Sequence, residues 1–188
     1  MTTTLTSRNK YSPVAQAAHW LTALLVALAW TLGVAGDEIP KGRYRDIAHF
    51  IHMSAGEMIV ALLLLRLVWR VIDPPPRAEI TPAGSKAALL ATLMQIALYL
   101  LIAAVAVAGV TLNFAGGHPL PFFKLFEFAS PWARDHDFKE RMEGVHEALA
   151  HGLVIFAGLH AGAALLHQYY FKDRVMARML PDQLTREA

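Results

Sequence analysis

Four long stretches that contain few charged residues constrain the fold of this chain more than any other feature. They cover about residues 14–36, 48–71, 87–114 and 146–170. A helix needs about 20 mostly apolar residues to cross roughly 30 Å of hydrocarbon, because each helical residue rises about 1.5 Å. The sequence therefore predicts an all-α integral membrane protein with a bundle of four transmembrane helices. Residues 1–188 are expected to form a single membrane domain that ends in a cytoplasmic tail at 171–188.

The distribution of positive charge predicts how the helices are oriented. Ten of the 17 Lys and Arg residues fall on the side that holds both termini and the second connection, which leaves seven on the other side. Positive charge is enriched in cytoplasmic loops, so both termini are expected in the cytoplasm. The net charge of +2 is attributed to these loops and not to nucleic-acid binding. The longest connection, residues 115–143, is expected to hold short helical turns on the membrane surface.

The chain contains no cysteine, and this restricts the metal chemistry that it can support. Disulfides, thiolate metal sites, iron–sulfur clusters and the C-x-x-C-H attachment of a c-type haem all require cysteine. Any haem would therefore be b-type, held without thioether bonds.

Histidines inside the apolar stretches are the unusual feature, because ionisable groups within a membrane bundle usually face its interior and carry function. His146 and His160 are fourteen residues apart, so they differ by about 40° around a helix and about 21 Å along it. By position in its helix, His52 matches the depth of His146, and His19 matches that of His160. The sequence therefore predicts two imidazole pairs across the bundle, at two depths.

Two separate pairs of imidazoles fit the axial positions of two b-type haems. A zinc ion usually takes four ligands, whereas a porphyrin leaves only two positions for the protein. A haem iron with both axial positions filled passes single electrons. Two alternatives stay open: histidines that merely lie at the membrane interface, and a non-redox protein that uses them for metal or proton transport.

Three other histidines are expected to be less central. His49 lies one turn from His52 and rivals it, although its place beside a polar loop favours a surface or supporting role. His151 is about 140° around the helix from His146, so it is expected to face away from the bundle centre. His167 returns to the face of His160 and is a candidate for binding a quinone or supporting the site, together with Gln168 and the aromatic residues 169–171. An interfacial belt of aromatic side chains is the alternative for that segment.

Motifs over almost the whole chain resemble the bacterial cytochrome b561 family. They are "AAHWLTALLVALAW", "HFIHMSAGEMIVALLLLRLVWR", "VHEALAHGLVIFAGLHAGAALLHQYYFKD" and the closing "RML". The resemblance is strongest in the first, second and fourth stretches. It implies a di-haem, b-type cytochrome of four helices in the bacterial inner membrane. It also implies that His19 and His160 bind one haem iron and that His52 and His146 bind the other.

The resemblance further implies an activity, the oxidation of superoxide at the outer face coupled to the reduction of ubiquinone. A cationic approach would speed the encounter with the superoxide anion. The seven basic residues on that side are Lys41, Arg43, Arg45, Lys124, Arg134, Lys139 and Arg141. The alternative is a cytochrome b subunit that exchanges electrons with a partner protein in a larger dehydrogenase or hydrogenase.

Overall fold

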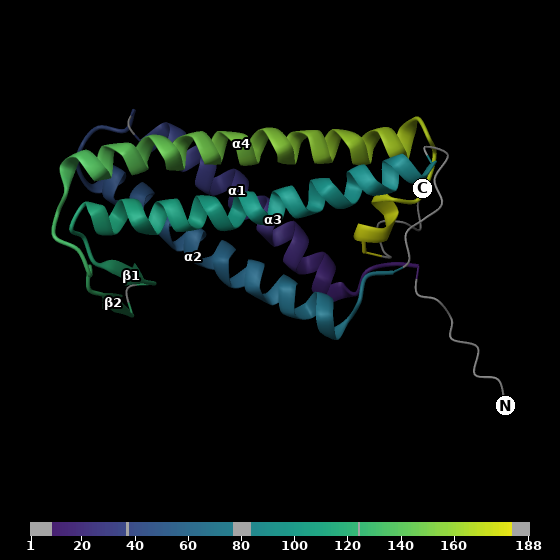
Figure 1. Ribbon diagram of the computed structural model, residues 1–188, viewed down its shortest axis with the longest axis horizontal. Coiled ribbons are helices and arrows are strands. Elements are labelled where there is room, and N and C mark those ends of the chain that lie inside the picture. The colour runs from purple at the N-terminus through teal and green to yellow at the C-terminus, as the bar shows by residue number, and fades with distance from the viewer. Residues whose placement is uncertain (1–8, 37, 77–83, 124, 182–188) are drawn as a thin grey trace.

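The computed structural model describes residues 9–36, 38–76, 84–123 and 125–181. This part of the chain contains four long helices, α1 (Pro13–Gly36), α2 (Arg43–Ile72), α3 (Gly84–Ala115) and α4 (His136–Tyr169). Two short strands, β1 (Leu120–Phe122) and β2 (Phe126–Phe128), lie between α3 and α4, and a 3₁₀ helix, η1 (Met176–Met179), follows α4. Figure 1 shows the helices running along one long axis, as the sequence predicts for an all-α bundle.

Three of the described helices are long and apolar enough to cross a membrane. They are α1, α3 over Lys86–Ala115, and α4, and the chain is a membrane protein. The helix α2 is 30 residues long but also carries six charged side chains. Its crossing of the bilayer as a fourth span therefore stays a prediction. The charged residues of α2 are Arg43, Arg45, Asp46, Glu57, Arg66 and Arg70.

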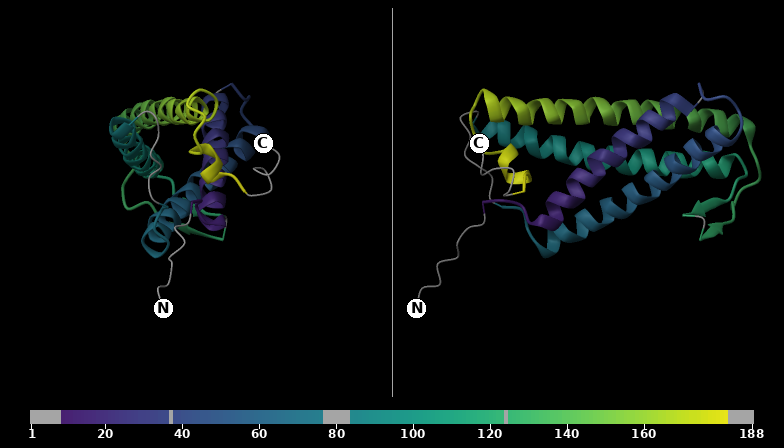
Figure 2. Two further views of the ribbon diagram at one scale, coloured as in Figure 1. Left: turned by 90° about the vertical axis from the view of Figure 1, so that its right-hand side faces the viewer. Right: turned by 180° about the vertical axis from the view of Figure 1, so that it is seen from behind.

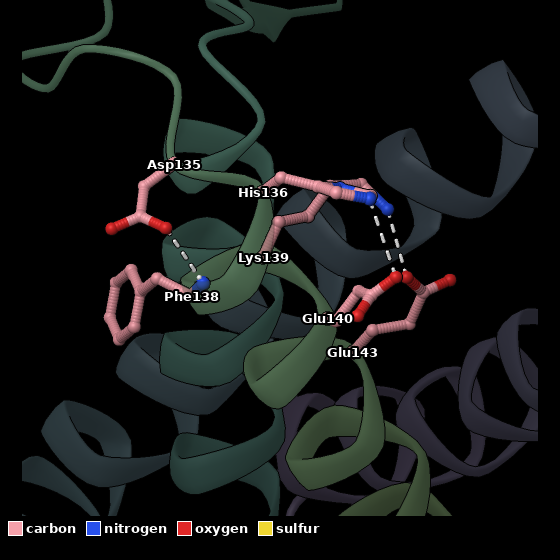
Figure 3. A network of polar contacts seen from close by, with 6 residues as sticks. All are labelled: Asp135, His136, Phe138, Lys139, Glu140 and Glu143. Carbon is pink, nitrogen blue, oxygen red and sulfur yellow. Dashed lines mark hydrogen bonds and ion pairs between the residues drawn. The ribbon is translucent and has the colours of Figure 1, made fainter.

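The helix α4 starts at His136, well before the apolar stretch that begins near residue 146. The Asp135 side chain caps this end by accepting a hydrogen bond of 2.9 Å from the backbone N–H of Phe138. Lys139 and Glu143, one turn apart, form an ion pair of 2.8 Å that supports the first turns (Figure 3). A polar start of this kind extends the helix beyond its apolar part.

The connection between α3 and α4 contains a β-hairpin, so the expectation of short helical turns there is wrong. In the hairpin, Leu120 lies opposite Phe128, and Phe122 lies opposite Phe126 in an antiparallel register. Pro119 and Pro121 disfavour a helix because proline lacks the backbone N–H that a helix needs. Alternating large apolar residues favour strands instead.

The helices pack as two close pairs. The helix α1 packs along α2, and α3 packs along α4, while contacts between the two pairs are much fewer. Figures 1 and 2 show that α1 and α2 are inclined to α3 and α4.

A small apolar core lies at the middle of the bundle. The cluster consists of the buried residues Ile59, Leu63, Ile102 and Leu153, from α2, α3 and α4. Many large apolar side chains point outward instead, and Leu24 and Leu100 are more than 60% exposed. In a membrane protein this apolar outer surface faces lipid, where apolar side chains are not exposed to water.

The chain before α1 and the chain after α4 meet at one end of the bundle, here called the tail end. The backbone N–H of Tyr11 donates to Arg178 O at 3.1 Å, and the Trp20 indole donates to Met179 O at 2.8 Å. The opposite end, beside the β1–β2 hairpin, is the hairpin end. The predicted cytoplasmic tail lies outside the described residues from position 182 onward.

Replacing Leu153 by Ala tests the core. Leu153 is 6% exposed, and the loss of a buried leucine side chain costs about 2–5 kcal/mol in well-packed proteins. We expect L153A to unfold at a clearly lower temperature than the unchanged protein in detergent. The matched control is L159A on the same helix, because Leu159 is 58% exposed and should change little. Equal losses in the two variants would contradict the assignment of the core.

Candidate functional site

Four histidines from three helices form two pairs inside the bundle. The rings of His52 and His146 have centres 6.1 Å apart, at an interplanar angle of 72°. The rings of His19 and His160 have centres 6.2 Å apart, at 77°. The first pair lies in the half of the bundle nearer the hairpin end and the second nearer the tail end. The structure thus brings together the residues that the sequence singles out, in the pairing that the family resemblance implies.

In the His52–His146 pair, backbone carbonyls fix the protonation of both rings. Nδ1 of His52 lies 2.8 Å from Ala29 O, and Nδ1 of His146 lies 3.0 Å from Val105 O. A carbonyl oxygen only accepts hydrogen bonds, so each Nδ1 carries the hydrogen. In the neutral imidazoles Nε2 then holds the free lone pair, which is the arrangement found in metal-binding histidines.

Two glycines allow neighbouring helices to come close to the same pair. A Cβ atom at Gly109 would lie 3.0 Å from Cε1 of His146, and one at Gly33 would lie 3.4 Å from Cε1 of His52. At Gly109 a Cβ would force the imidazole to shift, whereas at Gly33 it would make an ordinary van der Waals contact, so close approach is tightest beside His146. By contrast, a Cβ would meet no atom within 4 Å at four other helix glycines, Gly56, Gly152, Gly158 and Gly162.

The His19–His160 pair has a cation beside it. Nη2 of Arg66 lies 3.4 Å from Nδ1 of His19, and the Arg66 guanidinium lies 5.1 Å from the centre of the Tyr99 ring. A guanidinium is only a donor, so this long contact uses the lone pair on Nδ1 of His19. His19 can bind a metal through Nε2 only if its hydrogen is on Nδ1. The Arg66 guanidinium must then turn away from Nδ1.

The two pairs are separated by a layer of apolar side chains. Residues that are seven positions apart lie on nearly the same face of a helix. In each helix, three residues at this spacing form a stripe that runs past both pairs. The middle layer contains Val26, Ile59, Ile102 and Leu153, which contact one another in the core. The four stripes are His19–Val26–Gly33 in α1, His52–Ile59–Arg66 in α2, Gln95–Ile102–Gly109 in α3 and His146–Leu153–His160 in α4.

The remaining predicted histidines lie outside these pairs. His49 is exposed, so of the two rivals only His52 meets His146. His151 is exposed as well, and its ring lies 6.0 Å from Trp30. Nδ1 of His167 hydrogen-bonds to Asp173 Oδ2 at 2.5 Å, and the Asp173 side chain is only 6% exposed. His167 thus lies at the tail end with its ring orientation fixed by a buried carboxylate.

The spacing of each pair matches what an iron ion between two imidazoles requires. A bond from a metal to a histidine nitrogen is about 2 Å long, and the ring centre lies roughly 1 Å behind that nitrogen, so the two centres would be about 6 Å apart. The separations of 6.1 and 6.2 Å agree with this value. Within the described residues, no group of three or more His, Cys, Asp or Glu side chains is arranged to hold a metal ion by itself.

The basic residues at the hairpin end are only partly free to act on an approaching anion. Lys41 and Arg43 are exposed, whereas Lys139 is paired with Glu143 at 2.8 Å. Lys124 lies outside the described residues. Arg134 and Arg141 are exposed as well, so the exposed cations lie near the starts of both α2 and α4.

Three functional features are not apparent from the sequence reasoning. The carbonyls of Ala29 and Val105 carry no side-chain signal at all. Arg66, one of the ten basic residues assigned to the cytoplasmic side, lies beside His19. Its spacing of fourteen residues from His52 was the available signal, because it is the same spacing that links His146 to His160.

Comparison with known proteins gives consistent matches. The family described as prokaryotic cytochrome b561 matches residues 10–182. The chain is 32% identical over 174 residues to the "Probable superoxide oxidase CybB" of Yersinia pestis, covering 92% of this chain and 97% of the relative. It is 30% identical to "Cytochrome b561 homolog 2" of Escherichia coli K12, covering 92% of each. It is 28% identical to "Cytochrome b562" of Cereibacter sphaeroides, covering 94% and 98%.

Adding one methyl group at Gly109 tests whether close approach positions His146. In G109A the new Cβ must displace an imidazole that is also bound to Val105 O, so we expect weaker haem retention and a shifted reduced absorption band. The control is G152A, where a Cβ meets no atom within 4 Å and alanine favours the helix by about 1 kcal/mol. Haem content and optical spectra of both variants, purified in parallel, provide the measurement. Identical spectra for the two would contradict this role of Gly109.

Proposed function

The chain belongs to the prokaryotic cytochrome b561 family of haem-binding membrane electron carriers, and from this premise we propose that it oxidises superoxide to O₂ and reduces ubiquinone. The observation that carries the proposal is the presence of two imidazole pairs with ring centres about 6 Å apart, at two levels of one bundle. Electron transfer across a bilayer is expected to use at least two redox centres, one near each face of the membrane.

In this proposal each pair binds one b-type haem. His52 and His146 would hold the haem nearer the hairpin end, and His19 and His160 would hold the haem nearer the tail end. The bound haem supplies one-electron redox chemistry without an open coordination site. The guanidinium of Arg66 lies 3.4 Å from Nδ1 of His19, so it would balance the negative charge of a haem carboxylate bound there.

The reaction is balanced by two superoxide anions for each quinone. Two superoxide anions each lose one electron and leave as O₂, and one ubiquinone takes both electrons and two protons to become ubiquinol. In this proposal the protein lies in the inner membrane, with the hairpin end facing the periplasm and both termini in the cytoplasm. The excess of basic residues near the termini supports this orientation.

His167 is the proposed contact for ubiquinone at the tail end. Its Nδ1 donates to the Asp173 carboxylate, so Nε2 is the ring nitrogen that remains for a ligand. The side chain is 19% exposed and lies seven residues from His160 on the same stripe. A carbonyl of the quinone head group would accept a hydrogen bond from Nε2 when the imidazole is protonated.

A second candidate function is electron transfer as a cytochrome b subunit of a larger dehydrogenase or hydrogenase complex. The curated relatives that are called cytochrome b561 homologs carry no named substrate, so they fit either reading. A third candidate, metal or proton transport without redox chemistry, requires a colourless protein. Purified protein that stays colourless after haem-replete expression would exclude both redox functions.

Single histidine substitutions test the ligand assignment. We expect H52A and H146A each to lose the haem near the hairpin end, and H19A and H160A each to lose the other. The haem-to-protein ratio should fall from two to one in every case. H151A is the matched control, because His151 is an exposed histidine on the same helix as two proposed ligands. The choice of ligands would be wrong if H49A lost a haem and H52A kept both.

Rapid mixing with superoxide distinguishes the proposed oxidase from the subunit. Haem reduction should be fast in the isolated protein and should slow as ionic strength rises, because steering of an anion is screened by salt. R43Q, at the hairpin end, should slow reduction by roughly twofold, whereas K172Q, an exposed cation at the tail end, should not. Reduction no faster than the chemical background would reject the oxidase and favour the subunit.

A further inference from the structure

The β1–β2 hairpin has one aromatic face and one face without aromatic side chains. Side chains alternate between the two faces of a strand, so the cross-strand pairs Leu120–Phe128 and Phe122–Phe126 share one face. The rings of Phe122 and Phe126 stack with centres 4.8 Å apart, and that of Phe128 lies 5.2 Å from Phe126. The opposite face carries Pro121 and Glu127, which lie across from each other.

This aromatic face is not covered by the protein. Phe126 and Phe128 are each 50% exposed, and Leu125 at the turn is 77% exposed. A cluster of aromatic rings that is exposed to water is unfavourable. Exposed apolar patches of this kind normally mark a surface that contacts an apolar partner. The partner follows from the position of the hairpin along the bundle.

The tip of the hairpin reaches back to a level inside the helices. The backbone N–H of Phe123 donates to Oε2 of Glu57 at 3.2 Å. Glu57 is five residues beyond His52, which places it about 7 Å further along α2 toward the middle of the bundle. His52 itself meets His146, which is bound to Val105 within the apolar span Lys86–Ala115. Figure 1 shows the hairpin folded back beside the helices and not projecting from the end of the bundle.

The contact with Glu57 satisfies two polar groups that an apolar environment would penalise. An ionisable side chain at membrane depth requires a partner, and a backbone N–H at that depth requires an acceptor. The second N–H at the turn, that of Leu125, donates to Phe122 O at 2.8 Å. Both described N–H groups of the turn are therefore satisfied within the protein, as insertion among lipids demands.

We propose that the hairpin is a membrane-embedded flap whose aromatic face contacts the lipids of the leaflet at the hairpin end, and that Glu57 holds its tip in place. Aromatic side chains are enriched at the boundary between headgroups and acyl chains. Trp132, 47% exposed and 6.0 Å from the ring of Phe114, marks this boundary after β2. The occupant of the aromatic face is lipid and neither a second copy of the chain nor a partner protein. This inference depends on membrane insertion alone and not on the proposed superoxide chemistry.

Nitroxide labels on opposite faces of the hairpin test the proposal directly. The chain has no cysteine, so F126C and E127C each provide one labelling site without further changes. The labelled holoprotein is placed in bilayers of phosphatidylethanolamine and phosphatidylglycerol, and collisions with oxygen and with a water-soluble nickel chelate are measured. We expect the label at 126 to show a several-fold higher ratio of oxygen to nickel collisions than the label at 127.

Equal access of the nickel chelate to both labels would place the hairpin in water and overturn the proposal. Spin–spin broadening at 126 that disappears on dilution with unlabelled protein would show that a second copy covers the face, which also overturns the proposal.

The Glu57 contact is tested by adding E57L or E57Q to F126C. E57L should lower the oxygen-to-nickel ratio, whereas E57Q keeps a carbonyl acceptor and should preserve it. An unchanged ratio in E57L refutes the role of Glu57, and the haem content of each variant shows that the bundle is folded.

Discussion

A neutral imidazole inside a membrane bundle must find partners for two ring nitrogens, and this requirement organises the centre of the molecule. At His52 and His146 a backbone carbonyl takes the hydrogen on Nδ1, so both Nε2 atoms are left for a shared ligand between the helices. The carbonyls come from α1 and α3, which must therefore lie close to the rings. Glycines at 33 and 109 supply that closeness, because a Cβ at either position would meet a ring.

The second pair is built differently, and the difference has a chemical consequence. His19 has the Arg66 guanidinium near its Nδ1 and no carbonyl there among the contacts described above. Arg66 faces the lone pair on Nδ1 of His19, whereas backbone carbonyls accept the hydrogen on Nδ1 of His52 and His146. Between the two pairs, the layer around Ile59 and Leu153 consists of apolar side chains that pack against one another.

The two ends of the bundle are formed by different kinds of segment. At the tail end, backbone segments before α1 and after α4 bind each other, and a buried carboxylate orients His167. At the hairpin end, a polar helix start and an aromatic hairpin share the connection between α3 and α4. The two ends of the bundle therefore differ in structure.

Part of this architecture follows from local sequence. The hydropathy pattern predicts the helices, because crossing hydrocarbon requires long apolar runs, and the spacing of His146 and His160 predicts that they share a face. The early start of α4 was recoverable as well, since Asp135 and the Lys139–Glu143 pair are recognisable local signals. The hairpin differs from the short helical turns that are expected in the connection 115–143, because it depends on pairing between two strands.

The sequence by itself determined the class of fold, the absence of any thiolate chemistry and the four histidines that could meet in pairs, because these depend on composition and on the fixed geometry of a helix. The tertiary structure decided which atoms surround those histidines. The carbonyls of Ala29 and Val105, the contact of Arg66 with His19 and the hydrogen bond from Phe123 to Glu57 join segments more than 20 residues apart. Such contacts depend on how the helices are inclined and rotated against one another, whereas a local pattern shows only which residues share a helix face, as His52 and Arg66 do.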